Sequence, residues 1–310
     1  MSEPRLAVGD YVTHPIKPEW GLGRVLDVAG HTLTVYFRDL PGEHPRDALR
    51  KLRVDKVALE RRSVASDIVL DNLPPYRAGD FVRPPRERLT YQQGIEKFQA
   101  LFPLFFEDPR YIGDLKAGER AYKWAAHELF QQTLGGGTLG ALLQAREIDA
   151  ARTRVLAVEG RVNLLSRFEK AALREALRDD AVAEDYLLAL DALISDGVAK
   201  REGFERYIAA VERLPSVEGR TDPAKWPVAT LIPYLAEPST FAFLKPQVTQ
   251  ECAARLMFDL NYAPALSWLT YSKLHEMSVY LLGQLRRYGA RDFIDVQSFI
   301  YVIGGGSADA

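Results

Sequence analysis

Cysteine is almost absent from this 310-residue sequence. The single cysteine, Cys252, excludes an intrachain disulfide and a cysteine-based zinc site. The opening residues, MSEPRLAVGD, contain no apolar signal core, and the chain has no apolar run of about 18 residues, the length that a membrane-spanning helix needs. These absences favour a cytoplasmic protein of bacterial type that has no membrane-spanning segment.

A strong charge of one sign is also lacking. The formal net charge is −2, which does not predict binding to a polyanion by overall attraction. The content of 47% hydrophobic and 26% charged residues is that of a soluble globular protein, so the chain is not disordered throughout. Its length suits two domains.

The stretch from Val8 to Phe37 predicts a small antiparallel sheet. Residues 11–14, 24–28 and 32–37 alternate in polarity and contain β-branched side chains, which is typical of strands. Glycines and a proline-containing loop separate these segments and predict turns. Residues 47–52 predict a helical turn followed by a last strand.

The glycine and aromatic pattern of this stretch resembles a known fold. The pattern is Gly9-Asp10-x-Val12-x-His14, then Trp20-Gly21-x-Gly23-x-Val25, then Val35-x-Phe37. It resembles a Tudor-like or KOW-like small β-barrel, such as the one at the C-terminal end of UvrD/PcrA-type helicases. It is also similar to the RNA-polymerase-interacting domains of the CarD and transcription-repair coupling factor families. The resemblance covers residues 5–55 and implies binding to RNA polymerase or to nucleic acid.

One loop departs from the helicase version of this fold. The segment Ile16-Lys17-Pro18-Glu19-Trp20 replaces a shorter loop, and a longer loop changes the surface that a partner meets. Aromatic rings beside cations bind bases or peptides, and the same rings also serve as packing residues of a small barrel. The candidate binding residues of the barrel are Lys17, Trp20, Arg24, Tyr36 and Arg38.

The rest of the chain predicts a linker and a helical domain. Two Pro-Pro pairs interrupt regular structure in residues 61–88. From Thr90 onward, apolar residues recur at helical spacing. We therefore expect a barrel at 1–60, a linker at 61–88, a helical domain at 89–303 and a disordered tail at 304–310.

Motifs for catalysis and metal binding are missing. The glycine-rich turn at 135–140 lacks the Lys-Ser/Thr ending of a phosphate loop and follows a helix. The chain has no G-x-S-x-G elbow, no H-E-x-x-H helix and no nuclease-type Glu-x-Lys strand beside an acidic residue. The sequence predicts no cofactor and no metal.

Polar residues in the apolar C-terminal region form a second candidate site. Buried polar groups need partners, so these residues form either a hydrogen-bonded structural network or a functional site. They are Lys245, Asp292, Asp295 and Gln297.

The sequence thus predicts an α+β, mostly α protein: a small N-terminal SH3/Tudor-like β-barrel followed by an all-helical domain. We expect a non-catalytic interaction protein whose barrel binds RNA polymerase or nucleic acid in transcription, DNA repair or defence against foreign DNA. The helical domain would bind a protein partner or form a homodimer. The alternative is an enzyme, or an enzyme subunit, with a polar site in residues 226–301.

Overall fold

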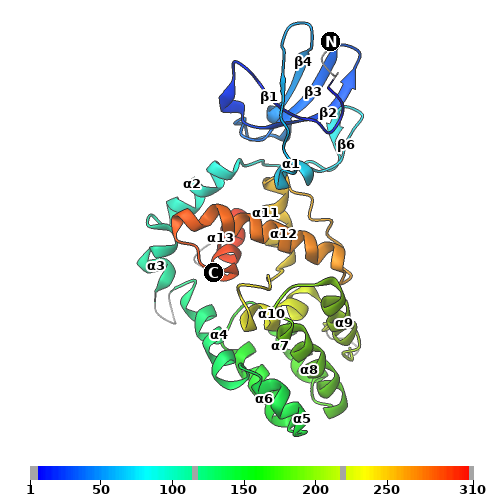
Figure 1. Cartoon of the computed structure of the whole chain (residues 1–310). Coiled ribbons are helices and arrows are strands. Elements are labelled where there is room, and N and C mark those ends of the chain that lie inside the picture. Colours follow the sequence, from blue (N-terminus) through cyan, green and yellow to red (C-terminus); the bar gives the residue numbers. More distant parts are fainter. Residues whose placement is uncertain (1–5, 114–117, 217–220, 307–310) are drawn as a thin grey trace. The chain divides into compact units, whose positions relative to one another are not determined.

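The computed structural model describes residues 6–113, 118–216 and 221–306 and divides the chain into two compact units. Unit 1 comprises residues 1–98 and 250–260, and unit 2 comprises residues 99–249 and 261–310. Residues 61–88, the predicted linker, belong to the same unit as the N-terminal sheet. The fold is α+β and mostly α, as predicted (Figure 1).

Unit 1 is built around a five-stranded antiparallel sheet with the order β4-β3-β2-β1-β5. The central strands coincide closely with the predicted ones. A β-bulge interrupts the β2–β3 register between Val25 and Asp27, and a bulge increases local twist. The strands are β1 (Tyr11–Thr13), β2 (Gly23–Ala29), β3 (Thr32–Phe37), β4 (Leu49–Arg53) and β5 (Glu60–Arg61).

The expectation of a closed barrel is wrong. Strands β4 and β5 are the two edges of the sheet and do not pair with each other, so the sheet stays open. Strand β5 has only two residues, both exposed, and offers too little backbone to close a barrel. The predicted helical turn before the last strand is present as the 3-10 helix η2 (Pro45–Ala48).

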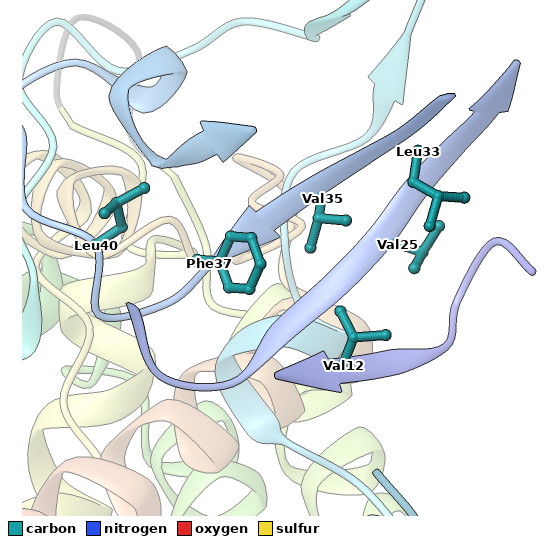
Figure 2. Close-up of a cluster of buried hydrophobic side chains, with 6 residues drawn as sticks. All are labelled: Val12, Val25, Leu33, Val35, Phe37 and Leu40. Carbon is teal, nitrogen blue, oxygen red and sulfur yellow. The ribbon is translucent and has the colours of Figure 1, made fainter. Parts of the chain in front are cut away.

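One face of the sheet carries an apolar cluster. Side chains from β1, β2, β3 and the turn after β3 are almost fully buried and pack together (Figure 2). The partly buried Trp20 packs against them. Gly23 is required here because a Cβ at this position would lie 2.7 Å from the ring of Phe37. The cluster consists of Val12, Val25, Leu33, Val35, Phe37 and Leu40.

A second apolar cluster joins the sheet to the rest of unit 1. Tyr36 and Ala48 pack with Leu70 of α1 (Ile68–Asp71), Phe81 of β7 (Asp80–Phe81) and Met257. Strand β7 pairs with β6 (Tyr76–Arg77) in a two-stranded hairpin. Residues 79–82, Gly-Asp-Phe-Val, are similar to residues 9–12, Gly-Asp-Tyr-Val, but the hairpin is not a second copy of the five-stranded sheet. The sheet therefore shares its core with residues that follow it in the sequence.

The remaining helices form unit 2, apart from α2 and α11, which the unit boundaries cross. Helix α10 is buried along its whole length, and α13 is buried except at Tyr301. The helices are α2 (Tyr91–Leu101), α3 (Pro109–Ile112), α4 (Ala121–Thr133), α5 (Thr138–Gln144), α6 (Ile148–Gly160), α7 (Arg167–Ala176), α8 (Asp180–Ser195), α9 (Arg201–Glu212), α10 (Trp226–Ala236), α11 (Pro246–Arg255), α12 (Trp268–Leu285) and α13 (Phe293–Ile303).

Short 3-10 turns complete the structure. They are η1 (Pro18–Trp20), η3 (Phe105–Glu107) and η4 (Arg286–Tyr288), in addition to η2. In the predicted tail, Gly304 and Gly305 donate backbone hydrogen bonds to Ile300 and Val302 at the end of α13, whereas residues 307–310 lie outside the described residues.

Candidate functional site

The loop Ile16–Trp20 is held in a defined conformation by local hydrogen bonds. The Ile16 amide donates to Nδ1 of His14 at 3.2 Å, and the Lys17 amide donates to the His14 carbonyl at 3.3 Å. The Trp20 amide donates back to the Lys17 carbonyl at 3.1 Å. The Ile16 side chain is nevertheless 78% exposed, which places an apolar group on the surface of a well-hydrogen-bonded loop.

Trp20 connects this loop to the apolar cluster. Its ring meets Phe37 edge-on at 5.1 Å and His14 at 4.7 Å between centroids, so one side of the indole is a packing surface. The guanidinium of Arg50 lies 5.2 Å from the ring centroid in a cation–π contact. Trp20 is half-buried. It therefore serves both as a packing residue of the sheet and as part of the surface. We call Ile16, Lys17, Trp20 and Arg50 the loop surface.

The predicted cations of the sheet have acidic partners. The Arg24 guanidinium donates to the Leu70 carbonyl at 2.6 Å and to Asp71 at 3.1 Å. Arg38 binds Asp67 and Asp39. Asp67 and Asp71 flank the short helix α1, so residues beyond the sheet neutralise two of its predicted binding cations.

Lys17 lies at the surface, where its ammonium is 3.7 Å from Glu19. The same pairing recurs at other arginines of the sheet and its loops: Arg46 with Asp80, Arg53 with Asp55, Arg61 with Asp10 and Arg62 with Glu60. The sheet therefore carries many cations but little uncompensated positive charge.

Tyr36 is a core residue. Its side chain is 2% exposed, its ring meets Phe81 edge-on, and its hydroxyl accepts a hydrogen bond from Nε of Arg88 at 2.9 Å. Burial raises the pKa of Tyr36, although the positive charge of Arg88 opposes this effect. The ring cannot stack on a partner from this position. The sequence analysis did not single out Arg88, because nothing in its sequence neighbourhood shows that it is buried.

In unit 2, Asp292 and Asp295 come together around a buried arginine. The Arg120 guanidinium binds Asp292 at 2.6 and 2.9 Å and Asp295 at 2.7 Å. The side chains are 7% exposed for Arg120 and Asp292 and fully buried for Asp295. Asp292 also caps the N-terminus of α13 by accepting from the Ile294 amide at 2.9 Å. We call the set around Arg120 the arginine–aspartate network.

Four more side chains complete this network. The Tyr111 hydroxyl donates to Asp295 at 2.5 Å, and the Lys123 ammonium donates to Ser298 at 2.9 Å and to Glu119 at 3.1 Å. Burial raises the pKa of Asp295 despite the nearby Arg120 charge, and burial lowers the pKa of Lys123. The network is thus a buried set of opposite charges. Burial favours the neutral form of both Asp295 and Lys123.

Neither of the other two C-terminal candidates makes a hydrogen bond to this network among the described residues. The Lys245 ammonium donates to the Leu164 carbonyl at 2.6 Å, at the turn before α7. Gln297 is buried, and its Oε1 atom has no hydrogen-bond partner among the described residues. The structure therefore brings two of the four predicted residues together, with Arg120, Tyr111 and Lys123 as partners that the sequence analysis missed.

The comparison with known proteins reaches only the N-terminal sheet. Residues 6–42 match the model of a family described as a protein of unknown function (DUF3553). The match spans β1, the loop Ile16–Trp20, β2 and β3. No curated protein and no solved structure matches the chain. The matched segment thus contains Ile16, Lys17 and Trp20 of the loop surface but not Arg50, and the match assigns no partner to it.

The described part of the chain contains neither a cluster of metal ligands nor a membrane-spanning helix. Among residues 6–113, 118–216 and 221–306, no group of three or more His, Cys, Asp or Glu side chains is placed to hold a metal ion. No described helix has the length and apolar character needed to cross a membrane.

Replacing Arg120 with methionine tests the arginine–aspartate network. The variant leaves two buried carboxylates without their cation, which costs about 3–5 kcal/mol of unfolding free energy at neutral pH. The loss should shrink as the pH falls. Without Arg120, the folded-state pKa of a buried aspartate lies above its unfolded value, so the folded state takes up protons first and gains stability on acidification. Denaturant unfolding at neutral and mildly acidic pH measures both effects.

The matched control is Arg213→Met, which removes an arginine from an ion pair with Asp185 whose side chains are 59% and 48% exposed. Its cost should stay below about 1 kcal/mol and change little with pH. Equal losses for the two variants would show that the network contributes no more than a surface pair.

Replacing Lys123 with methionine tests the buried ammonium. Burial lowers its pKa from 10.5, so in the window between the lowered value and 10.5 the unfolded chain binds the extra proton. The wild type therefore gains stability from this residue as the pH rises through that window, and the variant lacks the gain. The measurement is the difference in unfolding free energy between wild type and variant across alkaline pH. Parallel pH curves would contradict the prediction.

Proposed function

We propose that this chain is a non-catalytic interaction protein whose N-terminal sheet binds RNA polymerase or nucleic acid through the loop surface. The observation that carries the proposal is the exposed Ile16 side chain on a loop that hydrogen bonds and Trp20 packing hold in place. An apolar group on a pre-ordered loop binds with a small entropic cost, because little has to be immobilised. The resemblance of residues 5–55 to polymerase-binding domains supports the same partner class.

Between the two partners, the charge distribution favours the protein. Affinity for nucleic acid comes mainly from cations that neutralise phosphates, and it requires those cations to be available. Here Arg24 and Arg38 are already bound to Asp71 and Asp67. A protein surface, in contrast, can bind the exposed apolar side chain of Ile16 next to Trp20 and Arg50. Tryptophan and arginine are residue types enriched at the centres of protein interfaces. We therefore place RNA polymerase first.

The alternative of a C-terminal enzyme site receives less support. Its two acidic candidates, Asp292 and Asp295, are buried and bound to Arg120. Lys245 lies elsewhere, on the Leu164 carbonyl. A buried, paired set of charges meets the structural requirement for polar groups in a core, and it offers no side chain to an incoming substrate.

Substituting Ile16 with glutamate tests the proposal. The change places a charge at the tip of the loop surface, where it would be desolvated against the partner, while the exposed position leaves the unfolding free energy within about 0.5 kcal/mol of the wild type. Full-length wild type should retain purified core RNA polymerase in a pull-down, and the variant should retain at least about tenfold less, a difference of about 1.4 kcal/mol in binding.

Val54→Glu is the matched control, because Val54 is a 44% exposed apolar residue of the same unit that lies just beyond β4. It should bind polymerase like the wild type. Point variants are preferable to deletion of residues 1–62, since deletion would expose Leu70, Phe81 and Met257, which pack against Tyr36.

A second arm separates the two partner classes. Anisotropy titrations with duplex and single-stranded DNA at low and moderate salt would reveal phosphate binding by a steep loss of affinity with salt. Binding to DNA that Ile16→Glu weakens would assign the loop surface to nucleic acid instead of polymerase. No binding of wild type to polymerase or DNA would overturn the proposal.

A further inference from the structure

Arg88 is a buried arginine of unit 1 whose hydrogen-bond acceptors are all uncharged. Its side chain is 1% exposed. Nε donates to the Tyr36 hydroxyl at 2.9 Å, Nη2 donates to the Arg38 carbonyl at 2.9 Å, and Nη1 donates to the carbonyls of Leu40 at 2.8 Å and Gly42 at 3.4 Å. Three of these four acceptors belong to one stretch of backbone, Arg38–Gly42, the turn that follows β3.

This arrangement solves a local problem of the turn. Carbonyls that face the interior need donors, and an unpaired one costs as much as a lost hydrogen bond. A guanidinium has five N–H donors in a rigid fork, so one side chain can bind several carbonyls and the Tyr36 hydroxyl together. Lysine lacks this planar geometry.

The segment that carries Arg88 is fixed on both sides. The Arg88 amide donates to the Glu43 carbonyl at 2.5 Å, and the Leu89 amide donates to the Arg255 carbonyl at 2.8 Å. Glu87 forms ion pairs with Arg255 and with Lys97, each at 3.2 Å. The guanidinium therefore reaches the turn from a backbone that is held by Arg255 and by Glu43, the residue that follows the turn.

The turn Arg38–Gly42 is hydrogen bonded to Trp20 of the loop surface and to Leu22 after it. The Asp39 amide donates to the Trp20 carbonyl at 3.3 Å, and the Arg38 amide donates to the Leu22 carbonyl at 3.0 Å. Gly21 has φ of 70°, and a Cβ at this position would lie 2.0 Å from Oδ2 of Asp39. The turn Arg38–Gly42 and the chain just after Trp20 are thus packed closely and joined by backbone hydrogen bonds.

We infer that Arg88 is the positioning residue of the loop surface: it sets the turn Arg38–Gly42 and, through Asp39, the orientation of Trp20. The expected effect of Arg88 on binding rests on the proposed function. The effect of Arg88 on the position of Trp20 does not depend on any partner. A residue that lies 48 positions after Leu40 in the sequence thereby controls the shape of the surface that meets the partner.

Full-length Arg88→Met and Arg88→Lys variants test this role, with the chain labelled with 5-fluorotryptophan and the Trp20 resonance assigned by Trp20→Phe. In Arg88→Met, the fluorine shift of Trp20 should change, and exchange of the Asp39 amide should accelerate by at least about tenfold, because local opening no longer breaks the guanidinium bonds. Arg88→Lys should restore part of the protection, since an ammonium can still donate to some of the carbonyls.

Leu70→Ala is the control for a loss of stability alone. Leu70 is fully buried in the apolar cluster that contains Tyr36, but it accepts none of the hydrogen bonds that Arg88 donates. It should lower the melting temperature while the Trp20 shift and the Asp39 exchange stay as in the wild type under native conditions. If Leu70→Ala moves both signals as far as Arg88→Met does, Arg88 has only a general structural role and the inference fails. Unchanged signals in folded Arg88→Met would also overturn it.

Binding to polymerase, measured on the same variants, separates this inference from the proposed function. Arg88→Met should bind at least about tenfold more weakly, and Arg88→Lys should lie between it and the wild type. If the fluorine and exchange signals move as expected but no variant alters binding, Arg88 positions a surface that the partner does not use. That outcome contradicts the binding role and leaves the structural role standing.

Discussion

The constraint on which both units depend is that a buried guanidinium must use its N–H donors. In unit 1 the guanidinium of Arg88 binds a phenol and backbone carbonyls. In unit 2 that of Arg120 binds two carboxylates. Burying either group without partners would cost several kcal/mol, so each arginine fixes the segments that supply its acceptors. These two side chains therefore decide the conformation of segments that lie far apart in the sequence.

The two arginines have different consequences because their acceptors differ. Arg120 neutralises charge, and its removal would leave two buried anions. It ties the start of α4 to the start of α13, where Asp292 serves both as its partner and as the helix cap. Arg88 neutralises nothing among its hydrogen-bond partners. It organises a turn, and that turn supports the surface around Trp20. One network is thus a matter of core stability, and the other bears on the shape of a surface.

The ion pairs of unit 1 shape the functional interpretation as much as its fold does. Sequence composition shows arginines throughout the sheet, which on their own resemble a nucleic-acid surface. The structure places Asp67 and Asp71 at both ends of a one-turn helix, where they bind Arg38 and Arg24. Around the loop, Ile16 is exposed and apolar, Trp20 is half-buried, and the Lys17 ammonium lies 3.7 Å from Glu19. In the proposed function, shape and apolar contact therefore select the partner more than long-range attraction does.

Local sequence determined the secondary structure of this protein well. The alternation of residues 32–37 specified β3, and the apolar residues at helical spacing from Thr90 onward specified a helical region, because strand and helix signals act between neighbours in the chain. Polar residues in the apolar C-terminal region were recognisable for the same reason.

Only the tertiary structure decided that the sheet stays open, that Tyr36 faces the core, and that Asp292 meets Arg120. These outcomes depend on contacts between residues far apart in the chain, 52 positions for Arg88 and Tyr36 and 172 for Arg120 and Asp292. No periodicity encodes such pairings. The partner of a buried polar group is set by which segments pack together, and that choice is made by the whole fold.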